Sequence, residues 1–125
     1  MDEPATVGAE FARALAAKDQ SAIRDLLHPA IDFRGLTPNR SWEANDPDAV
    51  LYILFDQWFE DKDRIESLQQ LETDDIADRQ RVGYRFVVSN PDGRFVVEQQ
   101  AYLATGDGQI EWMRVVCSGF RPSRV

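Results

Sequence analysis

The stretch VGYRFVVSNPDGRFVVEQQAYL, residues 82–103, decides the fold of this 125-residue chain. β-Branched and aromatic residues dominate segments 82–88 and 95–103, which is typical of strands. The NPDG sequence between them, residues 90–93, suits a type I turn with glycine in the left-handed position. An antiparallel hairpin is therefore predicted here.

Three further segments are predicted to join this hairpin in a sheet. Residues 31–36 alternate apolar and polar side chains, as a short half-buried strand does. Residues 64–78 contain apolar residues spaced by three, as in a helix, but the TDD cluster at 73–75 favours a strand and a turn. The GDG sequence at 106–108 predicts a second turn, and residues 110–120 predict the last strand.

Helices are predicted to precede and cover that sheet. Pro4 can occupy the first turn of a helix whose apolar face continues to about Lys18. Asp19 can cap a second helix that stops before Pro29. Asp46 and Pro47 repeat this kind of start for a third helix, which is apolar around most of its circumference. The predicted fold class is therefore α+β, with three helices packed on a curved, mostly antiparallel sheet.

Composition and motifs argue against several classes of partner. The net charge is −8, with 14 basic residues scattered among 22 acidic ones, so a nucleic acid partner is not expected. No signal peptide and no apolar stretch of about 20 residues is present, so no membrane partner is expected. The single cysteine, Cys117, fits a reducing cytoplasm. The chain offers no metal-ligand spacing and no phosphate-binding motif, so we expect a cytoplasmic domain over residues 1–125 without metal or cofactor.

The turn at 90–93 allows faces to be assigned. If a bulge follows the turn and Asn90 opposes Arg94, eight residues share the inward face. They are Val82, Tyr84, Phe86, Val88, Val96, Glu98, Gln100 and Tyr102. The outer face then holds Arg85, Val87, Val97, Gln99, Ala101 and Leu103. Its apolar centre predicts a homodimer through this face.

The order of these elements resembles the cone-shaped nuclear transport factor 2-like superfamily, which includes ketosteroid isomerase and the SnoaL-like polyketide cyclases. The resemblance covers nearly the whole chain, through ALAAKD at 14–19, LLHPAIDF at 26–33 and DGQIEWM at 107–113. Within the superfamily, DFRGLTP at 32–38 with Trp42-Glu43, and VEQQAY at 97–102, resemble an actinobacterial SnoaL-like group. The resemblance implies a pocket between helices and sheet more than it implies a reaction.

Ketosteroid isomerase chemistry is not expected, because its functional positions carry other residues here. By resemblance, its general base falls at Arg34, its tyrosine donor at Phe11 and its protonated aspartic acid at Gln100. Arginine does not act as a base near neutral pH, and phenylalanine donates no hydrogen bond. The same alignment turns Met113, Val115 and Cys117 inward on the last strand, although a register with Trp112 and Arg114 inward stays open.

Arg34, Glu98 and Asp32 are the candidate residues for chemistry. Arg34 could hold an oxyanion with two parallel hydrogen bonds, or form an internal ion pair with Asp32 or Glu98. Desolvation would raise the pKa of Glu98 and suit proton transfer, whereas a salt bridge to Arg34 would lower it. Glu98 and Asp32 are therefore the candidate catalytic groups.

The remaining candidates would bind a ligand. Gln100 and Tyr102 could orient it, or hydrogen-bond to one another, while Tyr84 and Phe86 share their predicted face. Trp42 and Trp58 could stack on the ligand, although large aromatic side chains more often belong to the core.

Two functions follow from this sequence. The first is binding of a small, largely apolar organic molecule, with or without acid/base chemistry of the isomerase, cyclase, dehydratase or hydrolase type. The second is a dimerisation or protein-interaction module with a filled cone. A cavity of about 300 Å³ or more would favour the first.

Overall fold

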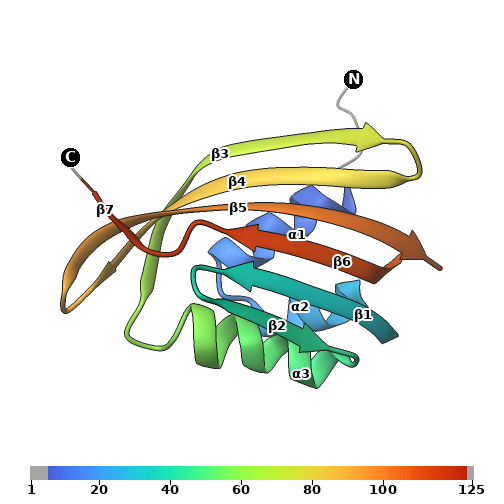
Figure 1. The fold of residues 1–125 in the computed structure, drawn as a ribbon, viewed down its shortest axis with the longest axis horizontal. Coiled ribbons are helices and arrows are strands. Elements are labelled where there is room, and N and C mark those ends of the chain that lie inside the picture. The colour runs from blue at the N-terminus through green and yellow to red at the C-terminus, as the bar shows by residue number, and fades with distance from the viewer. Residues whose placement is uncertain (1–5, 124–125) are drawn as a thin grey trace.

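The computed structural model describes residues 6–123, drawn in Figure 1. Pro4, at the predicted helix start, lies outside the described residues. The elements are α1 (Val7–Ala16), α2 (Gln20–Leu26), β1 (Leu27–Thr37), β2 (Arg40–Ala44), α3 (Pro47–Tyr52), the π-helical turn η1 (Ile53–Trp58), β3 (Arg64–Ile76), β4 (Arg79–Asn90), β5 (Gly93–Gly106), β6 (Gln109–Cys117) and β7 (Arg121–Pro122). Within the described residues, no helix is long and apolar enough to cross a membrane.

Side-chain caps begin the second and third helices where the sequence predicts them. Asp19 accepts a hydrogen bond from Ala22 N at 3.0 Å, and Asp46 accepts one from Ala49 N at 2.8 Å. Such caps satisfy backbone N–H groups that have no partner within the helix. The third helix continues into η1, where Phe59 N donates to Leu54 O five residues earlier.

One sheet joins the strands of residues 6–123 in the order β2-β1-β6-β5-β4-β3, with β7 paired to β5. β1 and β6 run parallel, and the other neighbours run antiparallel. The strand predicted at 31–36 is confirmed within the longer β1, and β3 confirms the strand reading of its segment. β2 was not predicted; it forms because the turn after Thr37 returns the chain along β1.

The helices lie on one side of the curved sheet (Figure 1). α1 packs against β3 and β4, α2 against α1 and α3, and α3 against β1 and β2. Between the two layers lies a core with fully buried aromatic side chains at Phe11, Phe33, Phe59 and Phe86. The predicted α+β class, with three helices on a curved and mostly antiparallel sheet, is confirmed.

The predicted faces of β5 are wrong by one residue. Asn90 pairs with Gly93 rather than with Arg94, so Pro91 and Asp92 alone span the turn and no bulge follows it. A one-residue shift moves every side chain of the strand to the opposite face. The register buries Val97, Gln99, Ala101 and Leu103, whereas Glu98 and Gln100 are exposed and Tyr102 lies at an outward position.

The faces of β4 and β6 agree with the sequence analysis. Val82, Tyr84, Phe86 and Val88 are buried on β4, as predicted. The last strand buries Met113, Val115 and Cys117, which excludes the alternative register. Of the residues predicted for the outer face, only Arg85 and Val87 lie there, so the apolar centre on which the homodimer was predicted is absent.

Candidate functional site

The predicted site residues divide between the two faces of the sheet. Trp42, Tyr84 and Phe86 face the helices, and Trp58 lies on η1 above that face; all four belong to the core or pack against it. Asp32, Arg34, Glu98, Gln100 and Tyr102 lie at outward positions. The prediction that one cavity brings both groups together is therefore wrong.

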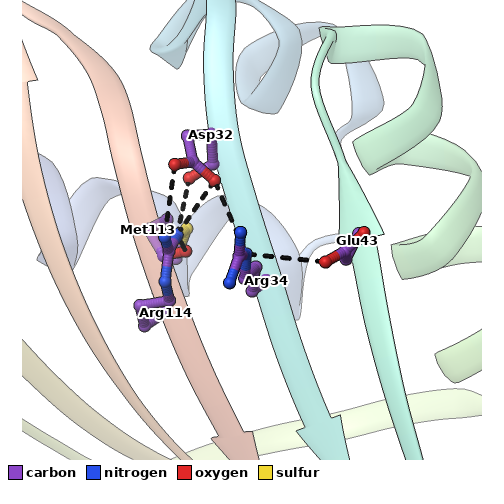
Figure 2. Close-up of polar contacts among 5 residues, drawn as sticks. All are labelled: Asp32, Arg34, Glu43, Met113 and Arg114. Carbon is purple, nitrogen blue, oxygen red and sulfur yellow. Dashed lines mark hydrogen bonds and ion pairs between the residues drawn. The ribbon is translucent and has the colours of Figure 1, made fainter.

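Asp32 and Arg34 take part in a chain of ion pairs on the outer face, shown in Figure 2. Arg114 donates to both carboxylate oxygens of Asp32, at 3.2 Å each. The Arg34 side chain is 59% exposed, and its Nε lies 4.0 Å from Asp32 and 3.7 Å from Glu43. Water therefore reaches these groups, and the contacts are those of surface ion pairs.

Glu98 and Gln100 are likewise paired in solvent. Arg85 donates its Nε to Glu98 at 2.7 Å. Arg81 lies 3.5 Å from the Gln100 oxygen and makes two hydrogen bonds of 3.0 Å to Asp74. Those hydrogen bonds lower the pKa of Asp74 below its ordinary value, with a smaller Coulombic contribution from Arg81. A hollow of about 390 Å³ adjoins Glu98, Gln100 and Tyr102, but it opens on the outer face.

On the inner face, polar side chains form a row across the neighbouring strands. Tyr84 of β4 pairs with Gln99 of β5, which in turn pairs with Cys117 of β6. Thr37 of β1 continues the row, because the preceding Leu36 pairs with the residue before Cys117. A phenol, an amide, a thiol and a hydroxyl thus lie side by side within an otherwise apolar layer.

Tyr84 and Gln99 form the buried part of this row. The Tyr84 hydroxyl donates to Gln99 Oε1 at 2.6 Å, and the two residues are 3% and 2% exposed. Burial raises the pKa of Tyr84 well above its ordinary value, and the nearby Cys117 adds to this effect. The phenol therefore keeps its proton near neutral pH and acts as a donor.

Gly35 makes room for Trp58 above the inner face. A Cβ at Gly35 would lie 2.6 Å from Cζ2 and Cη2 of the indole. The ring therefore packs directly on the backbone of β1 at this glycine. Phe33 and Trp42 flank that ring, with centroids 6.0 and 6.3 Å away. Trp42 is itself held by a hydrogen bond of 2.9 Å from its Nε1 to Thr37 Oγ1.

A pocket of about 180 Å³ lies between this aromatic wall and the end of the polar row. Its lining residues are Thr37, Trp42, Gln57, Trp58, Phe59, Cys117, Gly119 and Phe120. None of these side chains is a carboxylate, a histidine or a cation. The pocket is smaller than the 300 Å³ expected from the sequence for ligand binding, so most of the cone is filled by side chains.

Sequence reasoning missed Gln99 as a site residue. The sequence does indicate that Gln99 is buried, because it lies in the alternating set of Val97, Ala101 and Leu103, whose other members are apolar. The competing set of Glu98, Gln100 and Tyr102 is far more polar. A polar residue within such an apolar set is buried and therefore needs a hydrogen-bond partner in the interior.

Solved structures with this fold come from several bacteria. An isomerase candidate from Rhodopseudomonas palustris has 16% identity and a TM-score of 0.75, over 95% of this chain and 93% of that one. An isomerase candidate of the SnoaL-like family from Agrobacterium tumefaciens has 14% identity and a TM-score of 0.60, over 90% and 95%. An LEH-like epoxide hydrolase from M. tuberculosis has 12% identity and a TM-score of 0.64, over 90% and 80%.

Comparison of sequences identifies no relative. No family model matches the chain, and no curated protein matches it. At identities this low, the solved structures establish the shared fold and leave the chemistry to the residues of this chain.

Proposed function

From the SnoaL-like, nuclear transport factor 2-like fold of this chain, we propose that it binds a small, largely apolar organic molecule in the pocket beside Trp58. The observation that carries the proposal is the aromatic wall of Trp42 and Trp58 facing Cys117 and Thr37 at the end of the polar row. Ligand pockets combine such apolar walls with a few polar groups that orient the ligand.

The size of the pocket limits its ligand. Its volume of about 180 Å³ is close to that of an apolar cavity of about 150 Å³ known to bind benzene. One aromatic ring with a short substituent fits this space. A fused multi-ring ligand would require the π-helical turn carrying Trp58 to move away from Gly35.

The lining favours binding and orientation over carboxylate proton transfer. Glu98 and Asp32 point to the other face and are engaged by Arg85 and Arg114, so we assign them no catalytic role. Tyr84 and Phe86 do not line this pocket; the Tyr84 hydroxyl donates to Gln99 elsewhere in the polar row, and its ring lies 5.1 Å from that of Phe86.

A cavity-filling pair of variants tests the pocket. Cys117→Leu places a larger apolar side chain at the pocket wall and is expected to abolish the rise in Tm that a single-ring probe such as acetophenone causes. Val116→Leu makes a smaller apolar enlargement at the neighbouring outward position and is the control for an effect outside the pocket. Equal responses of the two variants, or no response of the unmodified chain, would refute the proposal.

A second proposal is a homodimer through the outer face. Leu36 and Val116 pair on adjacent strands and are 52% and 53% exposed, beside the hollow of about 390 Å³. Two half-exposed aliphatic side chains on the open face of the sheet favour contact with a second copy. The double variant Leu36→Lys, Val116→Lys should then reduce the molar mass measured by light scattering from dimer to monomer. A monomer without the substitutions would exclude this proposal.

The setting proposed with this function is cytoplasmic, within one domain over residues 1–125. It is supported by Cys117, a buried thiol without a disulfide partner. The actinobacterial grouping is likewise a proposal, based on DFRGLTP at 32–38 and VEQQAY at 97–102.

A further inference from the structure

Most polar groups in the wall of the proposed pocket already have partners within the protein. The Thr37 hydroxyl accepts a hydrogen bond of 2.9 Å from Trp42 Nε1 and donates to Arg40 O at 3.3 Å. Cys117 Sγ accepts from Gly119 N at 3.4 Å, and a thiol is a weak hydrogen-bond partner. These side chains therefore contribute little to the orientation of a ligand.

Gln57 is the lining residue that keeps a strong hydrogen-bonding group available. It lies on η1 at a half-buried position, so a ligand in the pocket can reach its side chain. Its Nε2 donates to the Tyr52 hydroxyl at 2.8 Å, whereas its Oε1 makes no hydrogen bond to residues 6–123. The neighbouring Trp58 Nε1 is also unpaired, but it is buried out of a ligand's reach. The group that remains for a ligand is thus an acceptor oxygen.

The π-helical turn explains why Tyr52 holds this amide. Side chains three or four residues apart face one another in an α-helix. In η1 the hydrogen bonds span five residues, as from Phe59 N to Leu54 O, so residues five apart come together instead. Tyr52 and Gln57 have this spacing. Tyr52 is 54% exposed and does not line the pocket, so it acts there only through Gln57.

We propose that the ligand carries a hydrogen-bond donor, as in an aryl alcohol or a phenol, and that Gln57 Oε1 accepts this hydrogen. Tyr52 is a positioning residue, because its hydroxyl occupies Nε2 and leaves Oε1 for the ligand. The inference rests on the proposed function and adds the chemical class of the ligand.

Two probes of nearly the same shape test the inference. α-Methylbenzyl alcohol has a hydroxyl where acetophenone has a carbonyl oxygen, so only the alcohol can donate a hydrogen. Both carry a single ring and should bind to the pocket, the alcohol more tightly. Gln57→Met removes the amide oxygen and is expected to reduce the preference for the alcohol about tenfold, equivalent to about 1.4 kcal/mol. The preference is the ratio of the two Kd values, measured by calorimetric titration.

Two further variants separate recognition by Gln57 from a general effect on the fold. Gln100→Met makes the same substitution at an exposed position on the outer face and should leave the ratio unchanged. Tyr52→Phe should reduce the ratio about threefold through loss of one hydrogen bond. It should have no effect on the ratio once Gln57 is replaced by methionine. An effect of Tyr52→Phe that persists in the double variant would contradict its role as a positioning residue.

The outcomes separate this inference from the pocket itself. Binding of both probes with a ratio that Gln57→Met leaves unchanged would overturn the donor inference and leave the pocket intact. Binding of neither probe to the unmodified chain would overturn both proposals.

Nuclear magnetic resonance gives a second readout that does not depend on the variants folding. The alcohol should shift the side-chain carbonyl carbon signal of Gln57 more than acetophenone does, because only the alcohol donates to that oxygen. The side-chain carbonyl of Gln100, on the outer face, is the internal control. Equal shifts of the Gln57 signal with both probes would contradict the inference.

Discussion

Gly35→Ala should destabilise the protein by displacing the indole that forms the pocket wall. The added Cβ would lie 2.6 Å from two ring carbons of Trp58, and Phe33 and Trp42 flank that ring. Overpacking a core costs about 1–3 kcal/mol. Replacing a glycine within a strand recovers about 0.5–1 kcal/mol. At the middle of these ranges the expected net loss is about 1 kcal/mol, or roughly 4 °C in Tm.

Gly83→Ala is the matched control for this prediction, because Gly83 lies within β4 at an outward position. Its Cβ would meet Arg81 Nη1 at 3.0 Å and Gln100 Cγ at 3.8 Å, which belong to flexible side chains. The control should be neutral or stabilised by up to about 1 kcal/mol. Urea unfolding followed by circular dichroism measures both variants. If Gly35→Ala were as stable as Gly83→Ala, the close packing of Trp58 on β1 would be refuted.

Three further predictions concern single side chains. Burial raises the pKa of Tyr84 in the folded protein above the value of about 10 in the unfolded chain. The protonated phenol therefore stabilises the fold fully below about pH 10, and this contribution is lost as the pH rises further. The free energy of unfolding should accordingly fall less steeply above about pH 10 in Tyr84→Phe than in the unmodified chain. Glu98→Gln should change stability by less than about 1 kcal/mol and leave acetophenone binding unchanged, since Glu98 pairs with Arg85 in solvent; a loss of binding would return Glu98 to the site. Asp46→Ala should cost about 1 kcal/mol in urea unfolding through loss of the cap on Ala49 N, and an unchanged midpoint would show that this cap is dispensable.

The elements could be predicted because their signals are local. Asp19 and Asp46 cap helices through hydrogen bonds to residues three positions later, and the alternation in residues 82–88 identifies the buried face of β4. These signals depend on the spacing of neighbouring residues, so the fold class followed from them.

The candidate site could not be predicted with the same success because it depends on register. One residue more or fewer in the turn at 90–93 decides whether Glu98 or Gln99 faces the helices. The Trp58 ring packs on the backbone of Gly35, which brings a π-helical turn against a strand distant in sequence. No local sequence pattern indicates this contact. Tyr84 and Phe86 were predicted on the correct face because they lie on β4, before the turn, so the error in turn length did not shift them.

Backbone amide shifts of the isotopically labelled chain on titration with acetophenone test the central claim most directly. Binding in the proposed pocket should concentrate the changes at Trp42, Trp58, Cys117 and Phe120, which line it. Changes centred instead on Glu98 and the outer hollow, or no saturable change anywhere, would contradict the account.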